Sequence, residues 1–158
     1  MTVFSIDKLM QETRRLATQY RQSTGQTLPV SGELARYDAT RLLHLTSEFK
    51  GTQGPLAHKV VQIKSRVIFD DQKSGYRIGQ LDLDGGWQMC ALVLYESNYE
   101  PFVIYIASRE IIVESLNKSN LKTKARGAMS LAQFKRIAQC VWTIENGLNW
   151  DEVLSNVS

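Results

Sequence analysis

The chain has little of what several enzyme classes require. Its 158 residues include only two cysteines, Cys90 and Cys140, and only two histidines, His44 and His58. Both cysteines stand in apolar segments without the pair spacing of a metal or redox site, so we expect core thiols and no disulfide. Two histidines leave little material for a serine–histidine or cysteine–histidine nucleophile. Phosphate-binding loops, dinucleotide fingerprints, HExxH and CxxC motifs are missing as well.

Long apolar runs and a strong charge of one sign are also missing. No segment has the roughly eighteen apolar residues that a membrane span needs, and the N-terminus lacks a basic region followed by an apolar run. We therefore expect no membrane partner and a cytoplasmic location. The net charge is only +3, which permits a phosphate-rich partner without demanding one. A length of 158 residues with 43% hydrophobic residues predicts a single domain over residues 1–158.

Residues 58–69 carry the clearest pattern in the chain, an alternation that predicts a β-strand. The apolar side consists of Val61, Ile63, Val67 and Phe69, and the polar side of Gln62, Lys64 and Arg66. Two interpretations stay open for the polar side. It is either the solvated face of a sheet or a polar pocket in an otherwise buried sheet.

The remaining patterns predict helices at both ends of the chain and strands between them. A first helix over residues 5–21 has an apolar stripe that includes Ile6, Leu9, Leu16 and Tyr20, and its basic side, with Arg14, is either solvated or aligned with a nucleic acid. The expected fold is α/β or α+β, a central mixed sheet of about four or five strands flanked by N- and C-terminal helices. The further helices are expected at 31–45, 108–116 and 130–145, and the further strands at 76–83, 87–95 and 102–107.

A basic segment lies between the last two expected helices. It has four cations in nine residues and no acid among them, a pattern that suits phosphate contacts or a plain solvated loop. Together with cations on the polar strand and the last helix, it supplies the candidate nucleic-acid-binding residues. These are Arg66, Lys118, Lys122, Lys124, Arg126, Lys135 and Arg136.

A helix that carries Glu33, followed by a strand with Gln62-Ile63-Lys64, resembles the PD-(D/E)XK, or restriction-endonuclease-like, superfamily. The segments GELARYDATRLL, VQIKSRV, YRIGQLDL and KARGAMSLAQFKRI look like a group of small bacterial proteins with such a core, over roughly residues 31–142. The resemblance implies Mg²⁺ as cofactor, Glu33 and Gln62 as its ligands, and Lys64 as the lysine that orients the attacking water. Glu33, Gln62 and Lys64 are therefore the candidate catalytic residues.

This sequence departs from that superfamily where the metal-binding aspartate is expected. Residues 51–54 read Gly-Thr-Gln-Gly, so a magnesium site would need Glu48, Asp70 or Asp82 to turn inward. We therefore expect a nucleic-acid-associated protein that binds DNA and whose metal-dependent phosphodiester hydrolysis is weak or lost. The alternative is a non-enzymatic subunit that keeps the fold and assembles with a protein partner or a second copy through exposed aromatics such as Tyr99 and Trp150.

Overall fold

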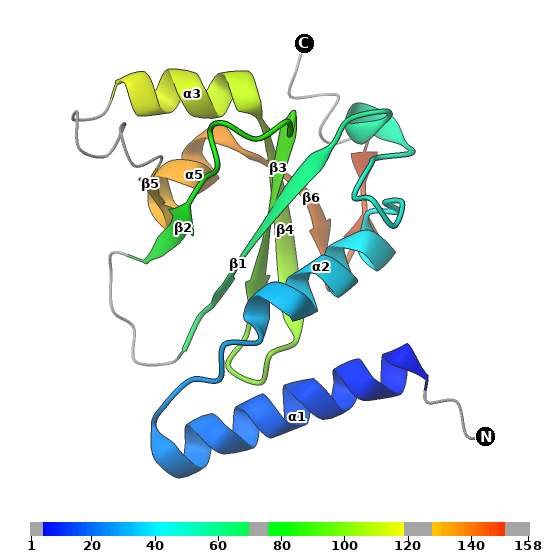
Figure 1. Ribbon diagram of the computed structural model, residues 1–158, viewed down its shortest axis with the longest axis vertical. Coiled ribbons are helices and arrows are strands. Elements are labelled where there is room, and N and C mark those ends of the chain that lie inside the picture. Colours follow the sequence, from blue (N-terminus) through cyan, green and yellow to red (C-terminus); the bar gives the residue numbers. More distant parts are fainter. Residues whose placement is uncertain (1–4, 70–75, 119–127, 151–158) are drawn as a thin grey trace.

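The computed structural model describes residues 5–69, 76–118 and 128–150. Its centre is a five-stranded sheet in the order β1-β3-β4-β6-β7, and a separate two-stranded sheet pairs β2 with β5. Helices flank the larger sheet (Figure 1), which confirms the expected α+β class with a central mixed sheet. The elements are α1 (Ile6–Thr24), α2 (Ser31–Leu42), the 3-10 turn η1 (Gly54–Leu56), β1 (Val61–Val67), β2 (Arg77–Gln80), β3 (Met89–Tyr95), β4 (Pro101–Ser108), α3 (Arg109–Asn117), β5 (Ala128–Ser130), α5 (Leu131–Ile137), β6 (Gln139–Thr143) and β7 (Gly147–Leu148).

The sheet is mixed because its strands pair in both directions. β1 runs parallel to β3, whereas β3 with β4 and β4 with β6 are antiparallel. Every residue of β3 is buried, as its unbroken apolar sequence predicts for a strand covered on both faces. β1 lies at the edge of the larger sheet, so the strand with the clearest alternation is not the central one.

Two clusters of buried side chains cover the two faces of the sheet. On one face, which we call the α1/α2 face, Val61 and Val67 of β1 pack with Leu34 of α2 and Ala17 of α1. On the other, the α3/α5 face, the core holds Ile112 and Leu116 of α3, Phe134 of α5, Ile78 of β2, and Cys90, Leu92 and Leu94 of β3. Both cysteines are free thiols; Cys90 is buried, as expected of a core thiol, whereas Cys140 is only half-buried.

Helix α1 is held to the rest of the fold by a buried polar cluster. Arg14 is only 5% exposed and Asp38 of α2 is fully buried. The Arg14 guanidinium donates to both carboxylate oxygens of Asp38, at 2.8 and 2.5 Å, and to the carbonyl oxygen of Tyr99 at 2.9 Å. The Tyr95 hydroxyl donates to Asp38 at 2.6 Å. The prediction that Arg14 belongs to an outward basic side of α1 was therefore wrong, because this guanidinium neutralises a buried carboxylate.

The apolar residues of α1 also differ from the expected core stripe. Of its residues only Arg14 and Ala17 are buried, and Met10 packs against the core at its edge. Ile6, Leu9, Leu16 and Tyr20 are instead exposed, by 56%, 45%, 47% and 39%. The apolar arc of α1 is thus wider than the surface on which the helix rests.

The segment 130–145 is not one helix, and this prediction was wrong. Helix α5 ends at Ile137, Ala138 has extended backbone (φ −95°, ψ 166°), and the chain continues into β6. Gln139–Thr143 reads QCVWT, a sequence with β propensity, and pairing with β4 satisfies its backbone hydrogen bonds.

Within the part of the chain that the structure describes, no helix is both long and apolar enough to cross a membrane.

Candidate nucleic-acid interface

The polar side of β1 points to the α3/α5 face. Gln62, Lys64 and Arg66 are in register with Cys90, Leu92 and Leu94 of β3, and residues in register share a face of a sheet. The Lys64 ammonium donates to the carbonyl oxygen of Gln80 on β2 at 2.7 Å. Gln62 and Lys64 are half-buried and Arg66 is exposed. The polar side is therefore neither a closed pocket nor a fully solvated face, since β2 covers part of it.

Gln62 and Arg66 differ in how their polar groups are satisfied. The side-chain oxygen of Gln62 is buried, and no hydrogen-bond donor in the described residues reaches it. The guanidinium of Arg66 lies 5.2 Å from the centroid of the Tyr76 ring, a cation–π contact that leaves its N–H groups directed to solvent or to a ligand.

Glu33 lies on the other side of the sheet. It is exposed in the first turn of α2 and forms an ion pair with Arg36, one turn along the same helix. Helix α2 packs on the α1/α2 face, through Leu34 and Ala35, whereas Gln62 and Lys64 point to the opposite face. The structure therefore does not bring Glu33 together with Gln62 and Lys64, and their common catalytic site is not assembled in this arrangement.

The residues in place do not fit a magnesium ion. At the position of the missing aspartate, a Cβ on Gly51 would lie 1.9 Å from the carbonyl oxygen of Leu56, so the backbone leaves no room there for a side chain. The Thr52 hydroxyl donates to the carbonyl oxygen of His44 at 2.6 Å. Mg²⁺ needs several oxygen ligands, usually with carboxylates among them, and the neutral Gln62 amide stands beside a lysine instead.

The other acids considered as replacement ligands do not change this result. Glu48 is exposed in the loop after α2. Asp82 is exposed and its carboxylate accepts from the backbone N–H of Asp84 at 3.2 Å, while Asp70 lies outside the described residues. Among residues 5–69, 76–118 and 128–150, no group of three His, Cys, Asp or Glu side chains could hold a metal ion.

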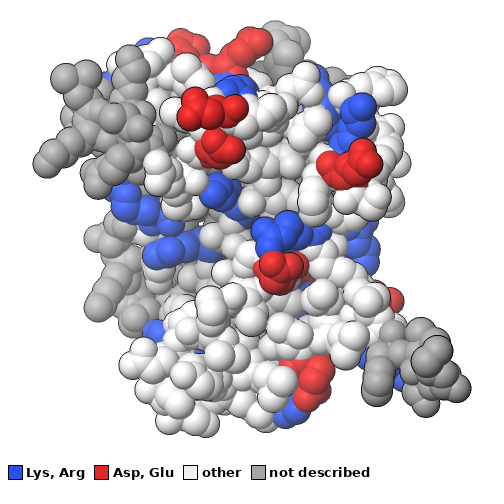
Figure 2. Space-filling model, viewed as in Figure 1, with Lys and Arg blue, Asp and Glu red and all other residues white. Residues whose placement is uncertain are grey.

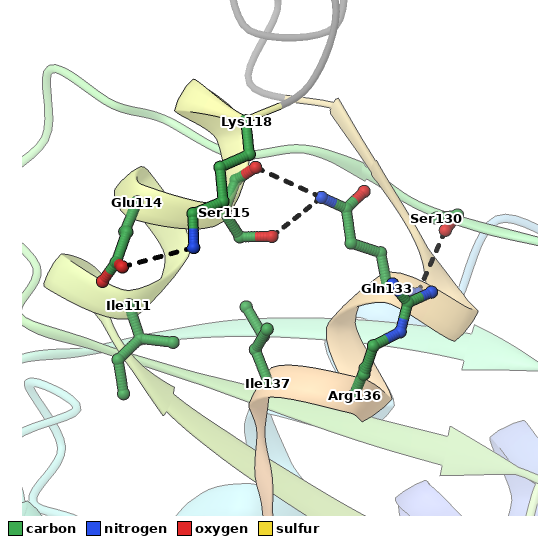
Figure 3. Close-up of a pocket in the computed structure, with 8 residues that line it drawn as sticks. All are labelled: Ile111, Glu114, Ser115, Lys118, Ser130, Gln133, Arg136 and Ile137. Atoms are coloured by element: carbon green, nitrogen blue, oxygen red, sulfur yellow. Dashed lines mark hydrogen bonds and ion pairs between the residues drawn. The ribbon is translucent and has the colours of Figure 1, made fainter.

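Two of the candidate phosphate-binding cations, Lys118 and Arg136, line one cavity. This cavity, of about 530 Å³, opens between the two helices, with Lys118 on the α3 side and Arg136 on the α5 side (Figure 3). Ile111 and Ile137 supply its apolar wall. Its full lining is Ile111, Glu114, Ser115, Lys118, Ser130, Gln133, Arg136 and Ile137.

Hydrogen bonds between the two helices hold this cavity in shape. The side-chain amide of Gln133 on α5 donates to the Ser115 hydroxyl of α3 at 2.8 Å (Figure 3). The Ser130 hydroxyl caps α5 by accepting from the backbone N–H of Gln133 at 3.1 Å. Lys118 forms an ion pair with Glu114 at 3.5 Å, and both side chains are exposed. Such an exposed pair is weak, so Lys118 can exchange this partner for a phosphate.

The candidate phosphate-binding residues that the structure describes share one side of the molecule. Arg66 on β1, Lys118 at the C-terminal cap of α3, and Lys135 and Arg136 on α5 all belong to the α3/α5 face, and all four are exposed. Lys122, Lys124 and Arg126 lie outside the described residues. Figure 2 shows Lys and Arg side chains across the middle of the molecule, with Asp and Glu side chains among them. The face is therefore basic, with single acids such as Glu114 within it.

The sequence patterns did not single out the cluster of Arg14, Asp38 and Tyr95. A signal for it exists, because Asp38 falls on the same helical side as Leu34 and Ala35, which are buried. A carboxylate on a buried side needs a cation, and Arg14 stands between Met10 and Ala17 on the covered side of α1. Burial is the largest single influence on Arg14 and lowers its pKa, but the hydrogen bond to Asp38 and the charges of Asp38 and Glu100 together raise the pKa of the guanidinium above its ordinary value.

Comparison with known proteins assigns neither a family nor a function to this site. The chain matches no protein-family model, and no curated protein matches it. The resemblance to PD-(D/E)XK nucleases therefore stays a prediction that rests on the sequence motifs.

Proposed function

We propose that the protein binds nucleic acid, with DNA as the expected ligand, through the α3/α5 face. The observation that supports this most is the convergence of Lys118 and Arg136 on one cavity, with Lys135 and Arg66 on the same side of the sheet. Phosphates recur along a nucleic-acid backbone, so a face with several separate cations suits them. The cytoplasmic location expected from the sequence belongs to the same proposal.

The ion pairing of the exposed cations supports the choice of the α3/α5 face as the binding surface. Within the described part of the chain, no carboxylate lies within ion-pair distance of Arg66, Lys135 or Arg136. By contrast, the exposed Arg15 and Arg36 on the α1/α2 side are each paired with a glutamate of their own helix. An arginine without an acidic partner keeps its planar N–H groups for a bidentate contact with phosphate. Arg15 and Arg36 are thus neutralised within their own helices, whereas Arg66 and Arg136 are not.

The second part of the proposal concerns hydrolysis of the bound nucleic acid. Glu33 is remote from Gln62 and Lys64, and the Lys64 ammonium is engaged by the Gln80 carbonyl. We infer a protein that binds without efficient cutting, so that any phosphodiester hydrolysis with Mg²⁺ is weak or lost. A plasmid assay with Mg²⁺ or Mn²⁺ tests this inference. Cleavage that disappears in Lys64→Ala would reverse it and establish a working nuclease.

Binding itself is tested by fluorescence anisotropy of a labelled duplex and a labelled single strand over a salt series. The variant Lys135→Gln/Arg136→Gln removes two cations from the α3/α5 face, and Lys8→Gln/Arg36→Gln removes two from the α1/α2 side. We expect the first variant to lower affinity about tenfold or more and to reduce the salt slope by about two, since each phosphate contact contributes about 0.9. The second variant should bind as the unmodified protein does.

Two results would overturn the proposal of nucleic-acid binding. One is the absence of salt-sensitive binding to either probe. The other is an equal loss of affinity in the two variants, because this would mean that total charge, and not the α3/α5 face, governs the interaction.

The second candidate function is that of a non-enzymatic interaction subunit. The aromatic surface expected for it is wrong in part, because Tyr99 is fully buried. Trp150 packs at the edge of the core and donates to the Gln53 side chain at 3.1 Å. A different apolar surface favours this candidate, namely the exposed side of α1 with Ile6, Leu9 and Leu16.

A further inference from the structure

The cavity between α3 and α5 offers more than positive charge. Ile111 of α3 is 43% exposed, and Ile137 of α5 lines the same space (Figure 3). Ser115, Ser130 and Gln133 add uncharged polar groups to the lining. Contact with phosphates alone depends on charge and makes no use of an apolar wall. The lining therefore suits a ligand that has both an anionic and an apolar part.

The apolar and cationic parts of the lining are separated along α3. Ile111, Glu114, Ser115 and Lys118 follow one another at intervals of three or four residues, so they share one side of the helix. Ile111 and Lys118 are two turns apart, about 10 Å along the axis. A single nucleotide has a matching arrangement, with a flat base at one end and a phosphate at the other.

We propose that this cavity binds one nucleotide unit, either a free nucleoside monophosphate or an unpaired nucleotide of a strand. The base packs against Ile111 and Ile137, as apolar side chains do around a flipped base, and the phosphate lies between Lys118 and Arg136. The volume of about 530 Å³ is within the range of roughly 300–1,000 Å³ of pockets for single small molecules. The inference rests on the proposed function, because the same two cations contact phosphate in both.

Arg136 is the main phosphate-binding residue of the cavity. No carboxylate of the described residues lies within ion-pair distance of it, whereas the Lys118 ammonium lies 3.5 Å from Glu114. Lys118 has to leave this weak, exposed pair to reach a phosphate, and the Glu114 carboxylate repels the anion. Glu114 therefore lowers the affinity of the cavity for a nucleotide, and its neutralisation should raise that affinity.

Isothermal titration calorimetry of the full chain with adenosine 5′-monophosphate tests the phosphate side of the cavity. Arg136→Gln should lower the affinity about tenfold or more, the loss expected for a hydrogen bond to a charged group. Glu114→Gln should raise the affinity about threefold. Its matched control is Glu110→Gln, since Glu110 is exposed one turn earlier on α3 and does not line the cavity. The control should leave the affinity unchanged.

Ribose 5-phosphate is the second probe and tests the apolar wall. It lacks the base, so it should bind about tenfold more weakly than adenosine 5′-monophosphate. Ile111→Gln should weaken binding of the nucleotide about fivefold and leave ribose 5-phosphate unaffected, because Ile111 contacts the base. The matched control is Ile144→Gln, because Ile144 is 57% exposed between β6 and β7 and lies outside the cavity. Circular dichroism of each variant verifies that it is folded.

Labelled DNA identifies the source of the nucleotide unit. If a strand supplies it, a duplex that carries one unpaired nucleotide should bind more tightly than the same duplex with blunt ends, and adenosine 5′-monophosphate should abolish this preference by competition. Binding of the free nucleotide without any preference between the two duplexes identifies a nucleoside monophosphate as the ligand. Either result supports the nucleotide cavity.

Two sets of results would overturn the inference. In the first, adenosine 5′-monophosphate does not bind and the unpaired nucleotide gives no preference; salt-sensitive binding of both duplexes would then leave the proposed function intact. In the second, ribose 5-phosphate binds as tightly as the nucleotide, or Ile111→Gln and Ile144→Gln lower nucleotide affinity equally, since the apolar wall would then contribute nothing. Nucleotide binding without binding of any DNA would instead refute the proposed function and support the cavity.

Discussion

Loss of the Asp38 carboxylate should destabilise this protein more than most single substitutions. Asp38→Ala leaves the guanidinium of Arg14, which is only 5% exposed, without the two hydrogen bonds it makes to this carboxylate. It also removes the acceptor of the Tyr95 hydroxyl. A buried charge stripped of its partner costs about 3–5 kcal/mol, and an unsatisfied hydroxyl adds about 1 kcal/mol. The total is a large part of the free energy of unfolding of a typical domain, which is roughly 5–15 kcal/mol.

Urea denaturation followed by tryptophan fluorescence measures this loss. With a slope of about 2 kcal/mol per molar urea, the midpoint should fall by about 2 M in Asp38→Ala. The midpoint of Tyr95→Phe should fall much less, because Asp38 keeps its hydrogen bonds to Arg14. Glu12→Ala is the control: the Glu12–Arg15 pair is exposed, and its removal should leave the midpoint unchanged.

The double variant Arg14→Met/Asp38→Ala separates charge burial from packing. Because it removes the stranded cation, it should be more stable than Asp38→Ala alone, although two residues are altered. Strictly additive losses, or an Asp38→Ala midpoint within about 0.5 M of the unmodified protein, would refute the reasoning that a buried ion pair anchors α1.

Two further predictions concern a buried thiol and a crowded glycine. Burial raises the pKa of Cys90 from 9.0 to about 12, so the stability that the neutral thiol contributes is complete below pH 9 and is lost as the pH rises toward 12. The free energy of unfolding of the unmodified protein should therefore fall faster above pH 9 than that of Cys90→Ala, by up to about 1.4 kcal/mol per pH unit; parallel curves would contradict this. Gly51→Ala would set its Cβ 1.9 Å from the Leu56 carbonyl oxygen, and it should cost about 3 kcal/mol or more in thermal or urea unfolding. Gly86→Ala, where a Cβ meets nothing within 4 Å, should cost little, and equal losses at the two glycines would show that the close contact is not the cause.

The sequence was sufficient for the parts of the fold that local periodicity determines. The alternation in β1 and the unbroken apolar runs of β3 and β4 identify strands, and the runs also identify which strands are buried. Ser108 fits the start of α3 because its hydroxyl accepts from the N–H of Ile111 at 3.3 Å. These features depend on neighbours within a few residues, so a single sequence contains them.

The predictions that were wrong concern features that depend on contacts between distant segments. Leu131, Phe134 and Ile137 have helical spacing that Val141 and Trp142 continue, yet the chain leaves the helix after Ile137 because β4 offers a strand partner. The stripe of α1 has the same ambiguity, since helical periodicity shows that a side is apolar and not what covers it.

The candidate site shows this limit most clearly. The sequence places Glu33 on a helix and Gln62 and Lys64 on a strand, as the structure confirms. Contacts between distant segments decide on which side of the sheet α2 packs. Because α2 packs on the α1/α2 face, Glu33 is separated from Gln62 and Lys64, which point to the opposite face. The grouping of Lys118 with Arg136 is tertiary as well, because it requires α3 and α5 to lie side by side.

The edge position of β1 has a consequence for how the sheet assembles. Only residues 96–100 separate β3 from β4, so their antiparallel pairing closes a short loop at small entropic cost. The parallel pairing of β1 with β3 must enclose residues 68–88, and the antiparallel pairing of β6 with β4 must enclose α3, β5 and α5. We therefore expect the β3–β4 hairpin to form before β1 and β6 add to it, so that the polar side of β1 acquires its orientation in a late step of folding.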